Sequence, residues 1–365
     1  MKKFGTIQRL NLWNITSLIS VFKLFIKVLN KMNYDSTIRK GLYIFVLISL
    51  THSVKAQDPQ FSQFYAAPLY LGPSMAGASD NGRLGLNFRD QWPKLSGKYI
   101  TYAVSYDQYI SRYYSGVGVL FMMDDAGGGK LTTTQVGLDY SYRIRASKEF
   151  YLQPGMELQY YQRKINFSKL TFADQFYGDQ ILPGSVELPP DNQAGHIDFS
   201  FSLLGFTKDM WLGSTVDHVM KTSKTLEQDI RYVPLKLSVY GGVKIPVNNV
   251  LLSRYEQNIS IAFNYRNQAS MQQLDLGAYY NRLPFMVGLW YRGIPIIPST
   301  DTKDAITVSG GVLIKNLIFT YSYDLTVSSL ITSTGGAHEL ALVYTFEQPH
   351  IKSKRKMGSV PCPKF

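Results

Sequence analysis

The chain of 365 residues contains one cysteine, Cys362. A single cysteine excludes an internal disulfide and any cysteine-rich metal site. In an exported protein we expect this thiol to be free or to pair with a partner. No other residue cluster indicates a metal or a cofactor, so the sequence predicts neither.

Long hydrophobic runs are also missing. Asn11, Asn14, Lys23 and Lys27 interrupt the stretch 10–29, so no clean run of the ~20 apolar residues of a membrane helix remains. Residues 32–56 instead have a basic start, an apolar centre at 41–50 and small residues before Gln57, the signature of a secretion signal. We expect cleavage after Ala56.

Met32 is then the natural start, which leaves residues 1–31 as an over-extended gene start or an unusual leader. The rival interpretation of the first residues is a transmembrane helix at 10–29. After the leader and signal peptide (1–56), we expect an N-terminal segment (57–81), a barrel (82–347) and a basic tail (348–365).

The folded body lacks net charge, although the whole chain carries +12. Residues 1–56 hold nine Lys or Arg and one acid, and the tail from Ile351 holds five more cations. The remainder has 24 basic and 25 acidic residues. Nucleic-acid binding therefore loses its main support. The tail run Lys352–Lys356 is expected to be solvated in the periplasm, or to dock on an acidic partner.

Helical periodicity is nearly absent, and alternation takes its place. In the stretch 317–325 every second residue is large and apolar or aromatic, and small or polar residues fill the gaps. The stretch 340–346 repeats this. Successive side chains of a strand point to opposite faces, so each strand has one apolar, aromatic-rich face and one small or polar face. The same pattern about a dozen times after a secretion signal predicts an all-β fold, a transmembrane outer-membrane β-barrel.

We expect fourteen antiparallel strands, an even number that places both termini in the periplasm. Their expected ranges are 83–89, 101–107, 117–121, 135–145, 151–165, 197–204, 211–219, 232–245, 259–265, 272–280, 285–291, 306–314, 317–325 and 340–346. Short links alternate with longer loops, as periplasmic turns and outer loops do. Two links disagree, 247–257 being long and 267–270 short, so the count could be off by two.

The concealed face of these strands carries charges that a dry core would not tolerate but a wet lumen would. We expect six lumen-facing residues to form a charge network that holds an inner segment, or a selectivity filter, with ordinary lumen polarity as the plain alternative: Arg89, Asp107, Asp139, Arg143, Arg145 and Asp324. His338 and Glu339, at the top of the last strand, are counted with them. The segment 57–81 does not alternate and holds three prolines, so it is expected to lie in or against the barrel without forming a strand.

Catalytic motifs are absent as well. None of the mature histidines at 196, 218, 338 and 350 belongs to a nucleophile motif such as GxSxG. The stretch Asp124–Lys130 suggests a phosphate or calcium loop, but Leu131 stands where a phosphate loop needs Ser or Thr. A glycine-rich outer loop between the third and fourth strands explains it better. We expect no enzyme; an outer-membrane lipase is the enzymatic alternative.

Several motifs together resemble the PorP/SprF family of outer-membrane proteins linked to type IX secretion in Bacteroidota. They are QDPQFSQFYAAPLYLGPSMAG (57–77), NFRDQWP (87–93), YAVSYD (102–107), LDYSYRI (138–144), LWYRGIP (289–295), YSYDLTVSSL (321–330) and GGAHELALVYTF (335–346). The ending VPCPKF (360–365) is similar to the SprF side of the family. The resemblance covers nearly all of 57–365, and only 1–31 depart from it.

The resemblance implies a non-enzymatic barrel that works with the secretion machinery on large surface proteins, including gliding adhesins. It would receive or anchor the C-terminal signal domain of its cargo, and its periplasmic side would contact motor-linked ring proteins. The residues it points to, as structural or binding positions, are Asp58, Pro59, Phe61, Phe64, Tyr65, Arg89, Gln91, Trp92, Asp124 and Asp324. The alternative is a substrate-conducting transporter with 57–81 as its plug.

Overall fold

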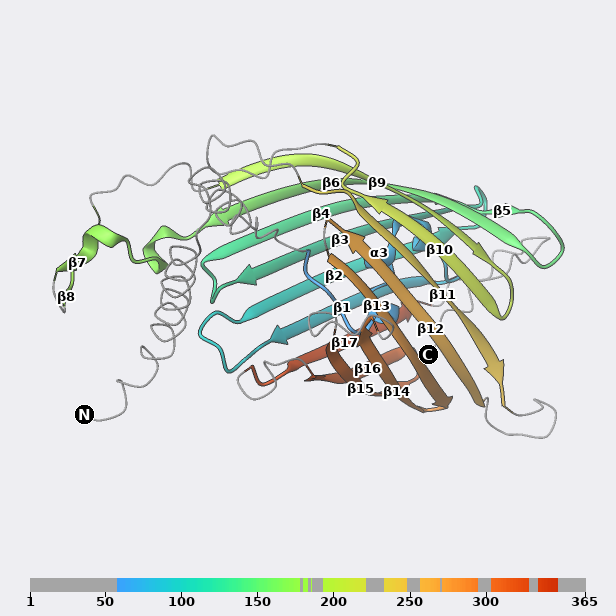
Figure 1. Ribbon diagram of the computed structural model, residues 1–365. Helices are drawn as coiled ribbons and strands as arrows, with labels where there is room; N and C mark the ends of the chain where they lie inside the picture. Colours follow the sequence, from blue (N-terminus) through green and yellow to red (C-terminus); the bar gives the residue numbers. More distant parts are fainter. Residues whose placement is uncertain are drawn as a thin grey trace, which may run out of the picture. The chain divides into compact units, whose positions relative to one another are not determined.

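The computed structural model describes residues 58–177, 180–182, 185, 193–220, 233–247, 257–269, 271–294, 303–327 and 334–346. The predicted signal peptide and the basic tail lie outside these residues. Fourteen antiparallel strands form a closed barrel (Figure 1). They are β1 (Gly82–Gln91), β2 (Tyr99–Ile110), β3 (Ser115–Ala126), β4 (Leu131–Tyr142), β6 (Tyr151–Ile165), β9 (Gln193–Phe206), β10 (Met210–Asp217), β11 (Lys236–Pro246), β12 (Gln257–Gln268), β13 (Met271–Arg282), β14 (Phe285–Gly293), β15 (Lys303–Ile314), β16 (Leu317–Thr326) and β17 (Ala337–Phe346).

Each strand pairs with its neighbour in the sequence, and β1 closes the barrel by pairing with β17 from Gly82↔Phe346 to Gln91↔Ala337. The short strand β5 (Ile144–Arg145) only extends the edge beside β6. Closure leaves no strand edge unpaired, which a barrel in lipid requires. The predicted barrel and its fourteen strands are confirmed, and the two irregular links do not change the count.

The alternation of the strands separates a lipid-facing surface from a lumen. On β4, Leu138, Tyr140 and Tyr142 are exposed on the outside, whereas Gln135, Asp139 and Ser141 are buried inside. β16 repeats this, with Phe319 and Tyr321 outside and Thr320, Ser322 and Asp324 inside. A lumen lined by polar residues must be hydrated or filled.

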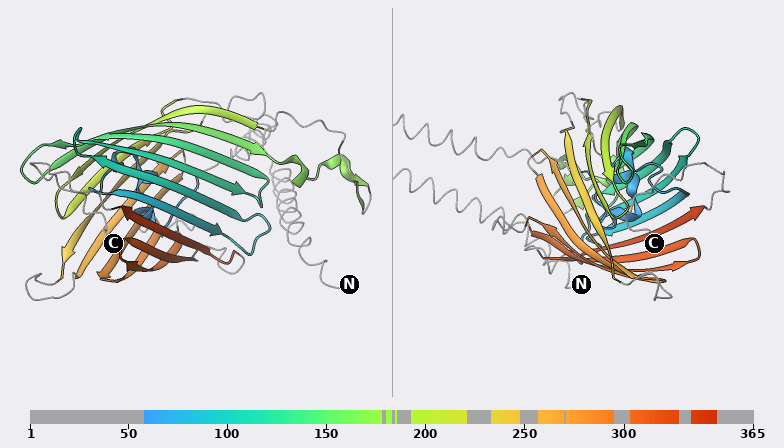
Figure 2. Two further views of the ribbon diagram at one scale, coloured as in Figure 1. Left: turned by 180° about the vertical axis from the view of Figure 1, so that it is seen from behind. Right: turned by 90° about the vertical axis from the view of Figure 1, so that its right-hand side faces the viewer.

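The two ends of the barrel differ in their connections (Figure 2). At the end that we call the short-turn end, strands are joined by residues 111–114, 146–150, 207–209, 283–284 and 315–316. The opposite, long-loop end carries among others the connection 166–192, which includes the hairpin of β7 (Phe176–Tyr177) and β8 (Gln180–Ile181). The expected exceptions persist: 247–256 is long at the short-turn end, and 269–270 is short at the long-loop end.

The glycine-rich stretch connects β3 and β4, as expected for an outer loop. Gly127, Gly128 and Gly129 all have positive φ angles, of 67°, 72° and 79°, a conformation that glycine adopts at no steric cost. No helix in the described parts of the chain is long and apolar enough to cross a bilayer.

The N-terminal segment, which we define as residues 58–81, fills the lumen. It contains three short turns of helix, η1 (Phe64–Ala66), α3 (Pro68–Leu71) and η2 (Pro73–Met75), and no strand. Residues 61–78 are all buried except the half-buried Tyr70. Their apolar side chains pack against large inward side chains of the wall, such as Tyr240, Tyr279 and Trp290. The segment therefore supplies the core that the polar lumen lacks.

The segment runs the length of the barrel. Asp58 contacts His218 and Gln268, which lie at the long-loop end, and Gly82 begins β1 at the short-turn end. Phe346 also lies at the short-turn end because it pairs with Gly82. Asp58 and Phe346 therefore lie at opposite ends of the barrel, because the N-terminal segment is threaded through the lumen. That both termini of the mature chain are periplasmic stays a prediction.

Strand glycines let the backbone of the segment approach the wall. A Cβ atom on Gly116 would lie 2.0 Å from the carbonyl oxygen of Ala76. We therefore expect Gly116→Val to push the segment off the wall and to cost about 1–3 kcal/mol of stability. The matched control is Gly310→Val, because a Cβ there meets nothing within 4 Å. Thermal melting of both variants tests this; equal melting temperatures would contradict a close approach at Gly116.

Candidate functional site: a lumen filled by the N-terminal segment

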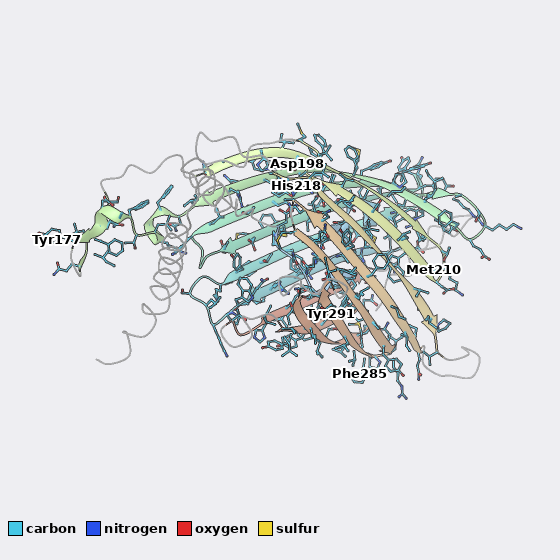
Figure 3. All side chains as sticks on the ribbon, viewed as in Figure 1. Tyr177, Asp198, Met210, His218, Phe285 and Tyr291 are labelled. Atoms are coloured by element: carbon cyan, nitrogen blue, oxygen red, sulfur yellow. The ribbon has the colours of Figure 1, made fainter. Side chains whose placement is uncertain are left out.

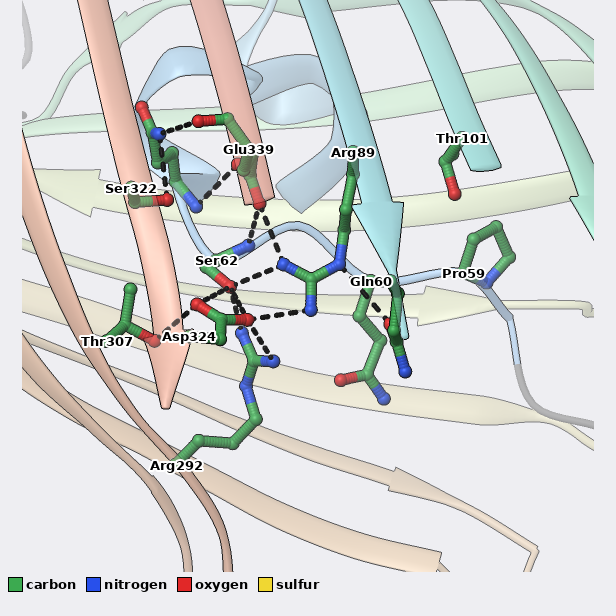
Figure 4. A network of polar contacts seen from close by, with 12 residues as sticks. Pro59, Gln60, Ser62, Arg89, Thr101, Arg292, Thr307, Ser322, Asp324 and Glu339 are labelled. Carbon is green, nitrogen blue, oxygen red and sulfur yellow. Dashed lines mark hydrogen bonds and ion pairs between the residues drawn. The ribbon is translucent and has the colours of Figure 1, made fainter. Parts of the chain in front are cut away.

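A buried charge network holds the segment near the long-loop end; we call Ser62, Arg89, Arg292, Asp324 and Glu339 the Asp324 network (Figure 4). Arg89 donates to Asp324 at 2.7 Å and to Glu339 at 3.0 Å. Arg292 donates to Asp324 at 3.2 Å. The strands supply these four side chains at inward-facing positions, and only Ser62 comes from the segment.

The segment is the shared partner of this network. The carboxylate of Glu339 accepts the backbone N–H groups of Ser62 (2.7 Å) and Gln63 (2.8 Å). The Ser62 hydroxyl donates to Asp324 at 2.7 Å and accepts from both guanidinium groups. The four charged side chains are at most 4% exposed. Two cations and two carboxylates are tolerated in a buried site only when they form ion pairs and hydrogen bonds with one another, as they do here.

A second cluster fixes the very start of the segment. The ring of His218 lies between two carboxylates, with Nε2 2.8 Å from Asp58 and Nδ1 2.7 Å from Asp198. Figure 3 labels His218 and Asp198. Lys236 lies 3.0 Å from Asp217 and 3.6 Å from Asp58. Burial disfavours a charged imidazole, but Asp58 and Asp198 outweigh burial and raise the pKa of His218 to about 9. His218 follows β10, and at neutral pH it is an imidazolium that donates to both carboxylates.

A third cluster holds the end of the segment near the short-turn end. Arg143 donates to the carbonyl oxygen of Gly77 at 2.6 Å, to Gln153 at 2.9 Å and to Asp80 at 3.2 Å. Asp107 accepts the backbone N–H of Gly77 at 2.9 Å and pairs with Arg83 at 2.9 Å. The segment is therefore anchored at both ends of the lumen.

Aromatic contacts secure its middle. Phe64 meets Trp290 edge to face with ring centroids 4.8 Å apart, and Tyr65 meets Tyr279 at 4.6 Å. Phe61 packs against Tyr70 of the same segment at 5.3 Å, and the Tyr70 hydroxyl donates to the carbonyl of Pro59. Such pairs are worth about 0.5–1.5 kcal/mol each beyond their buried area.

One pair of lumen carboxyl groups differs from the rest. Asp139 on β4 lies directly opposite Glu157 on β6, and both are buried. Neither oxygen of Asp139 has a hydrogen-bond partner among the described residues. Gln159 donates to one oxygen of Glu157. Asp139 is therefore in the lumen as expected, but it anchors nothing.

Other expected site residues lie outside the lumen network, and two expectations are wrong. Arg145 is exposed and donates to the carbonyls of Ser147 and Lys148, because it lies in the short edge strand β5 beside the turn 146–150, at the end of the barrel wall. His338 faces outward: its Nδ1 lies 2.8 Å from the Tyr321 hydroxyl, on the lipid-facing side.

The remaining three lie at the long-loop end. Gln91 accepts from Arg89 at 3.3 Å and so lies beside the Asp324 network. Trp92 packs on Tyr99 with centroids 5.5 Å apart, at a positive φ of 60°. Asp124 accepts from Thr101 at 2.7 Å, between β2 and β3.

Sequence reasoning missed several residues of the site. The alternation of β14 could have identified Arg292, because its side chain points inward like that of Trp290. It also lies in the motif LWYRGIP. For five other residues, no pattern in the sequence indicates which side chains they contact: Ser62, Gln63, Asp198, His218 and Lys236. Among the described residues, no three His, Cys, Asp or Glu side chains converge as a metal site would require. What the arrangement can do is hold a polypeptide segment in the lumen.

Residues 53–344 match the family described as type IX secretion system membrane protein PorP/SprF. No curated protein matches the chain.

Solved structures with a similar fold include three membrane barrels. The toluene transporter TodX of P. putida is 9% identical, with 76% of this chain and 93% of that chain covered and a TM-score of 0.43. Omp33 of Acinetobacter baumannii is 6% identical (74% and 100% covered, TM-score 0.42). The KdgM porin is 10% identical (73% and 99% covered, TM-score 0.33).

Proposed function

Because the chain belongs to the PorP/SprF family of type IX secretion system membrane proteins, we propose that it is a non-enzymatic barrel that binds the C-terminal signal domain of a large secreted surface protein, such as an adhesin. It would support secretion of that cargo or its anchoring at the cell surface. Membership in the family places it among secretion components, and ring proteins on the periplasmic side are further proposed partners.

The observation that carries the proposal is the filled lumen. Residues 61–78 are buried along its length, and charge clusters anchor the segment at both ends. A conduit for small substrates would have to release this segment, at the cost of unpaired buried charges. A filled barrel favours a binding or anchoring role over conduction.

The proposed orientation follows from the connections. Short turns in such barrels lie on the periplasmic side and long loops outside. The short-turn end, where Phe346 ends the last strand, would then face the periplasm, and the basic tail would follow it there. Asp58 would lie at the outer mouth.

The long-loop end offers an apolar surface for a protein partner. On the β7–β8 hairpin, Phe176, Tyr177 and Ile181 are 58%, 75% and 62% exposed. Figure 3 shows Tyr177 far from Phe285, which lies at the opposite end. A cluster of exposed apolar side chains on a water-facing loop marks an interaction site. We assign it to the cargo contact.

The test is a pull-down of the tagged protein from its native outer membrane in mild detergent, followed by mass spectrometry. A large surface protein retained through its C-terminal region supports the proposal. A barrel recovered alone that conducts in planar bilayers would instead favour the transporter.

Variants locate the contact. Replacing Phe176, Tyr177 and Ile181 with Ser should reduce cargo retention at least tenfold, since buried aromatic anchors carry ~1–2 kcal/mol or more each in interfaces. The matched control replaces Tyr113 and Phe285 with Ser, which are 61% and 65% exposed at the short-turn end. Loss of cargo in both variants would count against the hairpin as the contact.

A further inference from the structure

A pocket lies at the short-turn end of the barrel, between the turn Leu283–Pro284 and inward-facing side chains of the neighbouring strands. It has a volume of about 160 Å³. β12 to β16 line it, chiefly through Leu283, Met286, Val312, Leu313, Ile318 and Asn281. An apolar cavity of about 150 Å³ is large enough for one benzene ring. The pocket therefore fits a single aromatic side chain.

The wall of the pocket holds one polar group that the fold does not satisfy. Asn281 is 6% exposed, and its Nδ2 donates to Asn258 at 2.9 Å. Its Oδ1 has no hydrogen-bond partner among the described residues. A buried carbonyl without a donor costs free energy, so an occupant that brings an N–H group is favoured.

The chain itself brings a matching occupant to this end. Strand β17 ends at Phe346. Its residue Val343 pairs with Ile318 of β16, which belongs to the pocket wall, so the end of β17 lies near the pocket. Nineteen residues follow Phe346, and they end in Val-Pro-Cys-Pro-Lys-Phe, with Phe365 as their one aromatic residue. Pro361 and Pro363 have no N–H, whereas Cys362, Lys364 and Phe365 each have one.

The reach is sufficient. At ~4.8 Å per strand, the pocket centre near β14 lies about 15 Å around the wall from β17. Thirteen residues separate Phe346 from Val360, and extended chain spans ~3.3 Å per residue, so ~40 Å is available. A tethered segment also has a high local concentration at a nearby site.

We infer that residues 360–365 bind in this pocket, with the ring of Phe365 among Met286, Leu313 and Ile318 and a tail N–H donated to Asn281. This inference does not depend on the cargo.

The single cysteine allows a direct test on the full chain. Leu283→Cys and Leu313→Cys each place a second thiol at the pocket, because Leu283 lines its mouth and Leu313 points inward beside Ile318. Met210→Cys places one at the same end of the barrel but on β10, away from the pocket. Each variant is oxidised in mild detergent, and the disulfide with Cys362 is quantified by mass spectrometry. A disulfide needs Cα atoms within ~7 Å, so proximity is required.

We expect at least tenfold more disulfide at Leu283→Cys or Leu313→Cys than at Met210→Cys. Adding Phe365→Ala should reduce the yield to the level of Met210→Cys. Equal yields at all three positions would overturn the inference, as would a yield that Phe365→Ala leaves unchanged. The second result would mean that a detergent, a lipid chain or another protein fits the pocket better than Phe365. Heat-modifiable migration of each variant confirms that the barrel is folded.

Discussion

Asp324→Asn is expected to release the start of the N-terminal segment from the barrel wall. The substitution keeps the size of the side chain but leaves Arg89 and Arg292 facing a neutral amide, and both guanidinium groups are buried. Removing one partner of a buried ion pair costs about 3–5 kcal/mol. At 1.4 kcal/mol per factor of ten, amide exchange of the segment should accelerate about 100-fold or more.

The measurement is hydrogen exchange with mass spectrometry on peptides that cover residues 58–66. The amides of Ser62 and Gln63 are informative because both donate to Glu339, which shares Arg89 with Asp324. Release of this anchor should expose them while amides in the strands remain protected.

Asp139→Asn is the matched control. It makes the same chemical change at another buried lumen carboxyl group, but Asp139 has no hydrogen-bond partner among the described residues. Removing an unpaired buried charge is neutral or stabilising. If both variants exchanged equally fast, the effect would belong to lumen polarity in general, and the Asp324 network would not be a specific anchor.

The fold was readable from the sequence because lipid and lumen impose opposite demands on alternate residues. Tyr140 and Asp139 are neighbours in the chain, yet one must meet lipid and the other must avoid it. That demand ends where the barrel wall ends, which explains the error at Arg145: this residue lies in the short edge strand β5, which pairs only with β6. The alternation of β17 gives the correct direction for His338. This residue points to the same side as Leu340 and Leu342, which is the outside of the barrel.

The anchoring contacts of the segment were beyond sequence reasoning for a different reason. The segment 58–81 has no period, so nothing in it says which residues point toward which strand. Ser62 and Glu339 are 277 positions apart, and their contact exists only because the barrel closes around the segment. The alternation identifies the strand residues of the Asp324 network as inward-facing charges. It does not indicate that they hold the N-terminal segment.

Raising the pH from 6.5 to 9 is expected to weaken the barrel through His218. The ordinary pKa of this group is 6.5, and Asp58 and Asp198 overcome the opposing effect of burial and raise it to about 9 in the folded protein. The folded state therefore binds the proton more tightly than the unfolded state. This contribution is fully present below pH 6.5 and is lost as the pH rises through 9. The shift corresponds to about 3 kcal/mol.

Thermal melting across pH 6 to 10 checks this, with His218→Asn as the control. Asn removes the titrating group and tolerates the positive φ angle of 62° at this position. Wild type should lose about 3 kcal/mol more than the variant between pH 6.5 and 9, since other groups titrate alike in both. Parallel profiles would mean that His218 does not carry the proton between the two carboxylates. A difference in the expected window would show that Asp58, and with it the start of the segment, is held by a charge that alkaline pH removes.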